Sequence, residues 1–165
     1  MELYTDDLTL RTVTPDDVSE VARMWNFEKG AISLDEAEQA IAYMRDNHAK
    51  NRLGHIYHVC FAVYEKSEDV IIGWCGLDGK TENQLHLFYL IDSAYRNQGY
   101  ATQCAARLLA YAFEDAEVPF VNGGCAKENA ASFRVMEKIG MQQNAFEENG
   151  DPLFFIGRSR YFSML

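Results

Sequence analysis

The chain has 165 residues, 48% apolar and 24% charged, which is the balance of an ordinary globular protein rather than a disordered or fibrous one. Its formal net charge of −10 argues against the basic surface of a nucleic-acid-binding protein. No apolar run reaches the roughly 18 residues of a membrane span, and the N-terminus lacks the basic and apolar regions of a signal peptide. We therefore expect one cytoplasmic domain, residues 1–165, with no nucleic-acid or membrane partner.

The first elements are predicted to be a strand and two helices. Leu8 and Leu10 alternate with polar residues, as in a short half-buried strand. Thr14 and Pro15 supply an N-cap and a first-turn proline for a helix whose apolar stripe lies within residues 18–25. Ser33 and Glu36 form a capping box, which predicts a second helix over residues 34–44.

The middle of the chain has the pattern of three strands. Residues 58–64, 70–77 and 85–91 are rich in β-branched and aromatic side chains. The short segments 65–69 and 78–83 between them predict a hairpin and a loop. We expect these strands to form an antiparallel meander.

The last third is predicted to alternate helices and strands. A helix over residues 101–113, a short strand at Phe120 and Val121, and a helix over residues 129–139 follow in order. Two strand-like runs, residues 141–146 and 153–162, complete the chain. The order β-αα-βββ-α-β-α-ββ predicts an α/β (α+β) fold, with a central mixed sheet and helices on both faces.

The four cysteines, Cys60, Cys75, Cys104 and Cys125, are widely spaced, and each lies inside an apolar run. No CxxC pair is present. We expect buried free thiols in a reducing compartment and no metal site.

The stretch YRNQGYATQ, residues 95–103, lies where the third strand of the meander gives way to a helix. The first amides of a helix have no intrahelical partners and carry the positive end of the helix dipole, so they can bind an anion. Gly99 would let a ligand approach the backbone, and Arg96 would add positive charge. A simple turn with a strained Gly99 and a solvated Arg96 explains the same residues, so composition leaves both interpretations open.

Two motifs resemble those of a known family. The first is R-x-x-G-x-A, Arg96-Asn97-Gln98-Gly99-Tyr100-Ala101, behind a strand ending in Tyr89-Leu90-Ile91-Asp92; it resembles the acetyl-CoA pyrophosphate loop of the GNAT acetyltransferases. The second, NAASFRVMEKIGM over residues 129–141, resembles the N-x-x-S…E-K-x-G-[FM] segment of the RimJ/RimL-type branch of ribosomal-protein N-terminal acetyltransferases. The expected element order matches that fold over nearly the full length.

The resemblance implies an acetyl-CoA-dependent N-acetyltransferase and gives roles to particular residues. The strand before the loop would bind the pantetheine arm through its backbone, the loop amides would receive the pyrophosphate, and the next helix would lie near the thioester. The implied cofactor-binding residues are Tyr89, Leu90, Ile91, Arg96, Asn97, Gln98, Gly99, Tyr100, Ala101, Thr102, Asn129, Ser132 and Phe133. Asn129 also suits a helix N-cap, and the two roles are compatible.

Transfer of an acyl group to an amine requires a base for the amine proton and donors for the carbonyl oxygen, with modest help for the departing thiolate. Many relatives place a glutamate base on the strand before the loop. The corresponding residue here is His86, which is either the base or an inert histidine on a sheet face. The tyrosine that many relatives use as the acid is replaced by Met136. Ser132 is the acid that the RimJ/RimL branch suggests, or an ordinary helix serine.

The acceptor is expected to be a small-molecule or peptide amine: a protein N-terminus, a polyamine, an amino sugar or a small metabolite. Use of longer acyl-CoAs is left open. Because the acid and base both depart from the family pattern, the alternative function is a non-catalytic acyl-CoA-binding sensor or interaction module. The apolar C-terminal run, residues 153–165, predicts an exposed edge strand and, with dimers common in this family, a homodimer.

Overall fold

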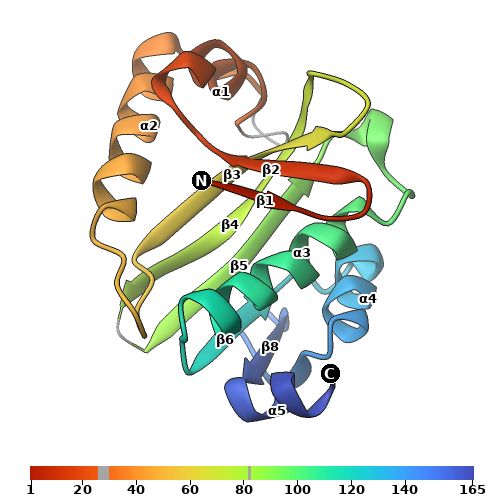
Figure 1. Ribbon diagram of the computed structural model, residues 1–165. Coiled ribbons are helices and arrows are strands. Elements are labelled where there is room, and N and C mark those ends of the chain that lie inside the picture. The colour runs from red at the N-terminus through yellow and green to blue at the C-terminus, as the bar shows by residue number, and fades with distance from the viewer. Residues whose placement is uncertain (26–29, 82) are drawn as a thin grey trace.

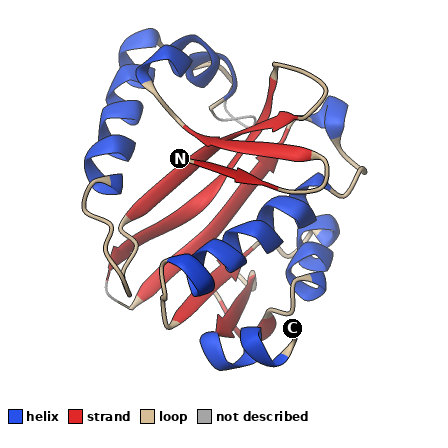
Figure 2. Ribbon diagram, viewed as in Figure 1, coloured by secondary structure: helices blue, strands red, loops and turns tan. Residues whose placement is uncertain are grey.

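The computed structural model describes residues 1–25, 30–81 and 83–165. The helices flank a central sheet (Figure 1, Figure 2). In chain order the elements are β1 (Glu2–Tyr4), β2 (Leu8–Thr12), the short helix η1 (Pro15–Asp17), α1 (Val18–Met24), α2 (Leu34–His48), β3 (His58–Glu65), β4 (Ile71–Thr81), β5 (Gln84–Ile91), η2 (Ser93–Tyr95), α3 (Tyr100–Ala110), the π-helical turn η3 (Tyr111–Asp115), β6 (Phe120–Gly124), α4 (Ala130–Lys138), β7 (Gln142–Phe146), β8 (Pro152–Gly157) and α5 (Arg158–Ser163).

The described strands form one eight-stranded sheet in the order β1-β2-β3-β4-β5-β6-β8-β7. Neighbouring strands are antiparallel except β5 and β6, which are parallel and are connected by the crossover that contains α3. The sheet is therefore mixed, which confirms the predicted fold class. The parallel pair at its centre is the place where the predicted anion-binding loop lies.

The two faces of the sheet are covered by different helices. On one face, α1 and α2 contribute Val21, Ile41 and Met44 to a cluster that includes Trp74 of β4. On the other face, α3 contributes Leu108 and other apolar residues to a larger cluster with β2 to β6 and β8. Successive strand residues point to opposite faces, so each central strand supplies both clusters. None of the described helices is both long and apolar enough to cross a membrane.

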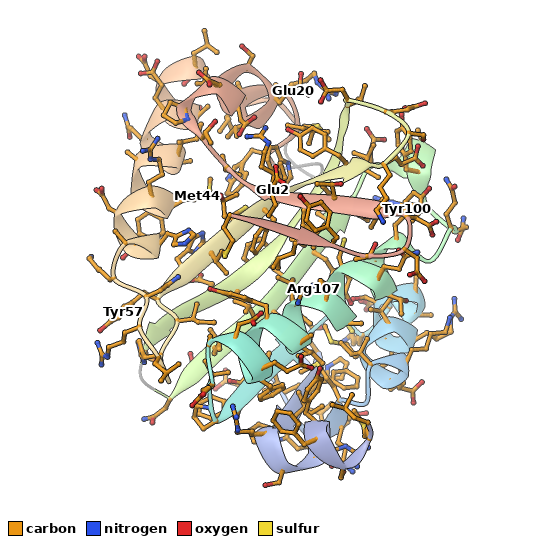
Figure 3. The ribbon with its side chains drawn as sticks, viewed as in Figure 1. Glu2, Glu20, Met44, Tyr57, Tyr100 and Arg107 are labelled. Carbon is orange, nitrogen blue, oxygen red and sulfur yellow. The ribbon has the colours of Figure 1, made fainter. Side chains whose placement is uncertain are left out.

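The N-terminal end of α3 is fixed from two sides. The Gln103 side chain accepts a hydrogen bond from the Thr5 hydroxyl at 2.7 Å and donates to the Asp7 carboxylate at 2.7 Å. The Tyr100 hydroxyl donates to Glu65 at the end of β3. Figure 3 shows Tyr100 at this end of the helix, near the turn between β1 and β2. The first turn of α3 is therefore held in place by contacts with the β1–β2 turn and with the end of β3.

The C-terminal run differs from the prediction. β8 ends at Gly157, and residues Arg158–Ser163 form α5 instead of continuing the strand. The helix is held by tertiary contacts: Arg158 donates to the Phe113 carbonyl oxygen, and the Tyr161 hydroxyl donates to Glu114 at 2.5 Å. β8 also lies between β6 and β7, so the predicted edge strand is wrong. At this end of the described sheet the edge strand is β7, whose residues are all exposed.

Two smaller differences lie at the other strands. The sequence did not predict β1, which pairs with β2 from Glu2 to Tyr4. The predicted loop over residues 78–83 is mostly strand, because β4 continues to Thr81 and Thr81 pairs with Gln84. Glu82, within that predicted loop, lies outside the described residues.

Candidate functional site

The loop between β5 and α3 is a sequence of tight turns. The Asp92 carboxylate accepts a hydrogen bond from the Ala94 amide at 3.0 Å, which starts η2. Arg96 donates through Nε to the Ile91 carbonyl oxygen at 3.1 Å, so its side chain fixes the loop to the end of β5. Asn97 and Gly99 have φ values of 63° and 78°, in the left-handed region. Gly99 therefore has a left-handed backbone, as a turn at this place requires, and Arg96 is hydrogen-bonded to the chain rather than only solvated.

The amides of residues 97–102 have no acceptor within the described chain. The first helical hydrogen bond of α3 runs from the Gln103 amide to the Gly99 carbonyl oxygen at 3.0 Å. Within the described chain, no backbone or side-chain acceptor receives a hydrogen bond from the amides of residues 97–102. A Cβ placed on Gly99 would meet no atom within 4 Å. Several donors at the positive end of a helix are thus available to an anion.

β5 and β6 separate just before this loop. In the described sheet their register pair is His86 with Asn122, and residues 87–91 have no partner on that side. The Asn122 side chain accepts a hydrogen bond from the Leu85 amide at 3.2 Å. A side chain thus replaces a main-chain acceptor at the point where the two strands separate. The gap leaves one edge of β5 open to an extended group that can form main-chain hydrogen bonds.

The N-terminal end of α4 borders the same gap. Asn129 is the N-cap of α4, and its side chain accepts from the Ser132 amide at 3.0 Å, so the predicted capping role is confirmed. The Ser132 hydroxyl lies 2.7 Å from the hydroxyl of Tyr89 on β5. Cys125, just after β6, lies near Ser132, and burial is the main cause that raises the pKa of its thiol. These contacts connect both sides of the gap.

The other two predicted positions on α4 belong mainly to the core. Met136 is buried and packs against Gly123, where an added Cβ would lie 2.8 Å from the methionine sulfur. Phe133 is partly buried and meets Phe154 edge to face, with ring centroids 5.1 Å apart. Met136 therefore fills space beneath β6 and has no proton to donate.

His86 lies on the opposite face of β5 from Tyr89. Leu85 and Leu87 belong to the cluster beneath α3, whereas Phe88, on the same face as His86, packs against the cluster of α1 and α2. His86 is half-buried and pairs in register with Asp78 of β4, which in turn pairs with His58 of β3. We call these three residues the His-Asp-His row.

The row carries both charge and aromatic neighbours. Asp78 Oδ1 lies 3.6 Å from Nδ1 of the buried His58. The His58 ring stacks on Phe88 of β5, with centroids 6.2 Å apart, and meets Tyr43 of α2 edge to face at 5.7 Å. Paired residues on neighbouring strands point to the same face. The row therefore presents a carboxylate between two imidazoles on the face covered by α2.

These observations test whether a coenzyme A thioester fits the site. Its pyrophosphate requires several converging donors, which the amides of residues 97–102 supply. Its extended arm requires an unpaired strand edge, which residues 87–91 supply. The group fits. A concavity of about 500 Å³ over β2 and the β3–β4 turn is less suitable, because the carboxylates that line it (Glu2, Glu65, Glu68, Asp69) outnumber the cations (Arg11, Lys66).

The family comparison agrees with this geometry. Residues 7–142 match the family model described as an acetyltransferase (GNAT) domain, and the chain belongs to this family. The chain is 30% identical over 146 residues to the uncharacterized N-acetyltransferase YnaD of Bacillus subtilis (strain 168), an alignment that covers 87% of this chain and 72% of YnaD. The prediction of an N-acetyltransferase is thereby confirmed at the level of enzyme class.

Solved structures of low sequence identity share the fold. RimL, a ribosomal L7/L12 α-N-protein acetyltransferase in complex with coenzyme A, has a TM-score of 0.79 at 14% identity, over 95% of this chain and 98% of RimL. A mutant form of the spermidine N-acetyltransferase SpeG of Vibrio cholerae has a TM-score of 0.79 at 18% identity, over 96% of this chain and 98% of SpeG. Both likenesses agree with the GNAT fold that the motifs and the element order indicate.

Sequence reasoning overlooked four side chains around the site. Cys125 is half-buried rather than fully buried, unlike Cys60, Cys75 and Cys104. The Tyr89 hydroxyl was overlooked because only its backbone was expected to bind. Asp78 was assigned to a loop, and His58 had no motif. The alternation of apolar residues in the strands could not predict that these residues lie close together, because their proximity depends on the register between strands.

Proposed function

We propose that this protein transfers an acetyl group from acetyl-CoA to a primary amine by direct attack of the amine on the thioester. The observation that carries the proposal is the run of amides at residues 97–102, which have no acceptor within the described chain and lie at the end of an unpaired strand edge. Backbone donors of this kind bind phosphates without a reorganisation cost, because the loop and the first turn of α3 are already held in place.

On the cofactor side, each element would hold a different part of acetyl-CoA. The amides of residues 97–102 would bind the pyrophosphate, with the positive charge of Arg96 beside them. The backbone of Tyr89, Leu90 and Ile91 would bind the pantetheine arm along the open edge of β5. Asn129, Ser132 and Phe133 would border the thioester end, where α4 closes the gap.

On the acceptor side, His86 would remove a proton from the attacking amine, directly or through one water. His86 is on the face of β5 opposite to Tyr89, which contacts Ser132, and the gap between β5 and β6 would have to open to both faces. This arrangement lets the amine approach from the α2 face while the sulfur departs on the α4 face. A positioned base contributes roughly 10²–10⁴-fold to the rate. The cysteines have no part in this direct transfer.

The acceptor is a primary amine of a small molecule or peptide. RimL acts on a ribosomal protein N-terminus and SpeG on spermidine, so both chemistries belong in the test. The protein is incubated with acetyl-CoA and a panel of N-terminal peptides, polyamines, amino sugars and small amines, and the free thiol of CoA is measured. We expect amine-dependent thiol release above the rate of thioester hydrolysis. Cofactor binding without release for any amine would favour a non-catalytic acyl-CoA-binding module.

Binding is tested separately by thermal unfolding. CoA at about 100 times its dissociation constant is expected to stabilise the fold by about 2.7 kcal/mol. CoA, acetyl-CoA and longer acyl-CoAs are compared, since the strand edge alone does not select an acyl length. An unchanged melting temperature with all of them would contradict the assignment of the loop.

We also propose a homodimer, by a different edge from the one predicted. β7 is an edge strand of the described sheet, all of its residues are exposed, and Phe146 is 66% exposed. Exposed strand edges with apolar side chains favour pairing with a second chain. Light scattering at micromolar concentration is expected to give twice the 18.8 kDa mass of the chain. A single species of 18.8 kDa would contradict the proposal.

A further inference from the structure

A pair of hydroxyl groups crosses the gap between β5 and α4. The Tyr89 hydroxyl lies 2.7 Å from the Ser132 hydroxyl oxygen and 3.3 Å from the Ser132 carbonyl oxygen. Both residues are half-buried, and they are separated by 43 positions in the sequence. The contact places a phenol directly behind the serine that borders the thioester end of the proposed cofactor site.

The hydrogen atoms of this pair can be arranged in two ways. In one, Tyr89 donates to the Ser132 carbonyl oxygen, and the serine hydroxyl donates to Tyr89. In the other, Tyr89 donates to the serine hydroxyl oxygen, which leaves the serine hydrogen free to point elsewhere. Each hydroxyl has one hydrogen, so the serine can donate to a third group only in the second arrangement.

We propose that Tyr89 is a positioning residue: by donating to Ser132 it directs the serine hydroxyl hydrogen at the sulfur of the departing CoA thiolate. The proposal rests on the proposed acetyl transfer. During that transfer the C–N bond forms, the C–S bond breaks and the electron pair of that bond goes to sulfur. The Ser132 O–H group donates a hydrogen bond to this sulfur. The proton that the amine nitrogen loses, passed through the base and water, finally joins the sulfur.

Three further observations support this role. The Asn129 side chain holds the Ser132 amide, so the serine has a fixed backbone from which to donate. Burial raises the pKa of Tyr89, which keeps the phenol protonated, and hence a donor, throughout the neutral range. Met136 is buried and cannot supply the hydrogen that a tyrosine at that position supplies in many relatives.

The pair is tested by a double-mutant cycle on kcat. Ser132→Ala is expected to lower kcat by about 10²-fold, and Tyr89→Phe by about tenfold, with the KM for acetyl-CoA unchanged within about twofold. The double variant is expected to match Ser132→Ala, because Tyr89 has nothing to position once the serine hydroxyl is absent. A merely structural tyrosine would instead lower kcat by the same factor in both backgrounds.

The matched control is Tyr161→Phe, which removes a phenol hydroxyl from α5, outside the site. It is expected to leave kcat unchanged. Tyr89→Phe with wild-type kcat would overturn the proposal, and so would full additivity of the two substitutions. Melting temperatures of all variants show whether any loss of activity reflects loss of folded protein.

The wild type separates this inference from the proposed function. If wild-type protein releases no thiol with any amine, the proposed acetyl transfer fails before the variants are compared. If it turns over and the coupling between Tyr89 and Ser132 is absent, the transfer stands and the positioning role of Tyr89 is wrong.

Discussion

The two faces of β5 present different chemical groups, main-chain groups on one and side chains on the other. Toward α3 and α4, the site consists mainly of backbone: the amides of residues 97–102, the unpaired edge of β5 and the first turn of α4. Toward α2, it consists of side chains drawn from three strands, the His-Asp-His row of His58, Asp78 and His86. The first side fits a fixed, chemically invariant ligand, and the second fits a ligand whose identity can change with the side chains.

Under the proposed function, this difference would let the fold keep one cofactor and exchange acceptors. Backbone donors depend on turns and helix ends, so their position is set by the fold. Side chains on a sheet face can be replaced without changing strand pairing, provided that the pattern of buried residues is kept. Substitutions on the two sides should therefore alter different quantities: cofactor affinity on one side, and turnover or acceptor recognition on the other.

The largest expected effect is on the cofactor side. Gly99→Glu places a carboxylate beside the amides expected to bind the pyrophosphate, at a position where φ is 78°. A left-handed conformation costs a non-glycine residue about 1–2 kcal/mol, and like charges in contact cost several more. We expect CoA affinity to fall by about 10²-fold or more, measured by calorimetry.

The control for this variant is Gly54→Glu. Gly54 has a φ of 81°, an added Cβ there would also meet nothing within 4 Å, and it lies in the loop before β3. Its strain is the same, so it should lower stability similarly and leave CoA affinity unchanged. Wild-type affinity in folded Gly99→Glu protein would place the phosphates elsewhere.

The sequence predicted the helix caps and the turn at Gly99 better than the His-Asp-His row for a physical reason. The capping box of Ser33 and Glu36, the cap at Asn129 and the turn at Gly99 are local features, since their partners lie within a few residues. Local spacing is what a sequence shows directly. The predictions of the central helices and of a mixed sheet are therefore confirmed.

The rest depends on contacts between distant segments. The three residues of the row are neighbours because β3, β4 and β5 pair in a particular register. Asp78 was not recognised as part of it, because residues 78–83 were predicted to form a loop. The segment after Gly157 contains the strand-favouring Tyr161, yet it forms α5 because Arg158 and Tyr161 bind the π-helical turn η3. Tertiary contacts of this kind override local propensity.

The next effect is on turnover. His86→Ala removes the proposed base, and we expect kcat to fall by about 10²-fold with little change in acetyl-CoA affinity. Gln84→Ala is the matched control, since Gln84 lies two residues earlier on the same face of β5 and is exposed. Steady-state kinetics and melting curves are measured on both. A lower melting temperature with unchanged turnover per folded molecule would make His86 a structural residue.

A smaller effect is expected at the centre of the row. Asp78→Asn keeps the shape of the side chain and removes its negative charge beside His58. If the row binds a protonated amine before transfer, kcat/KM for a cationic acceptor should fall by about tenfold, close to the loss of one charge-assisted hydrogen bond. Acetyl-CoA affinity should not change. An equal loss of CoA affinity would mean that Asp78 supports the whole sheet rather than the acceptor side.

The smallest effect is expected at the hydrogen bond between Tyr161 and Glu114, which lies outside the proposed site. A substitution there should change the stability of the fold and leave turnover unchanged. Burial, and then the hydrogen bond to Glu114, raise the pKa of Tyr161 to about 12 from an ordinary value of 10.0. The folded state therefore favours the neutral phenol, so the contribution of this contact is complete below pH 10 and is lost as the pH rises toward 12.

Tyr161→Phe should lower the free energy of unfolding by about 1 kcal/mol near neutral pH, the usual value of one hydrogen bond. Because phenylalanine does not titrate, the difference between the two proteins should shrink above pH 10, as urea unfolding at several pH values would measure. Since kcat is expected to be the same in both proteins at neutral pH, this variant fixes how large a stability change can be without altering either face of β5. A difference that stays constant from neutral pH to pH 12 would show that the Tyr161 hydroxyl ionises equally in the folded and unfolded chains, and that α5 is held by packing instead.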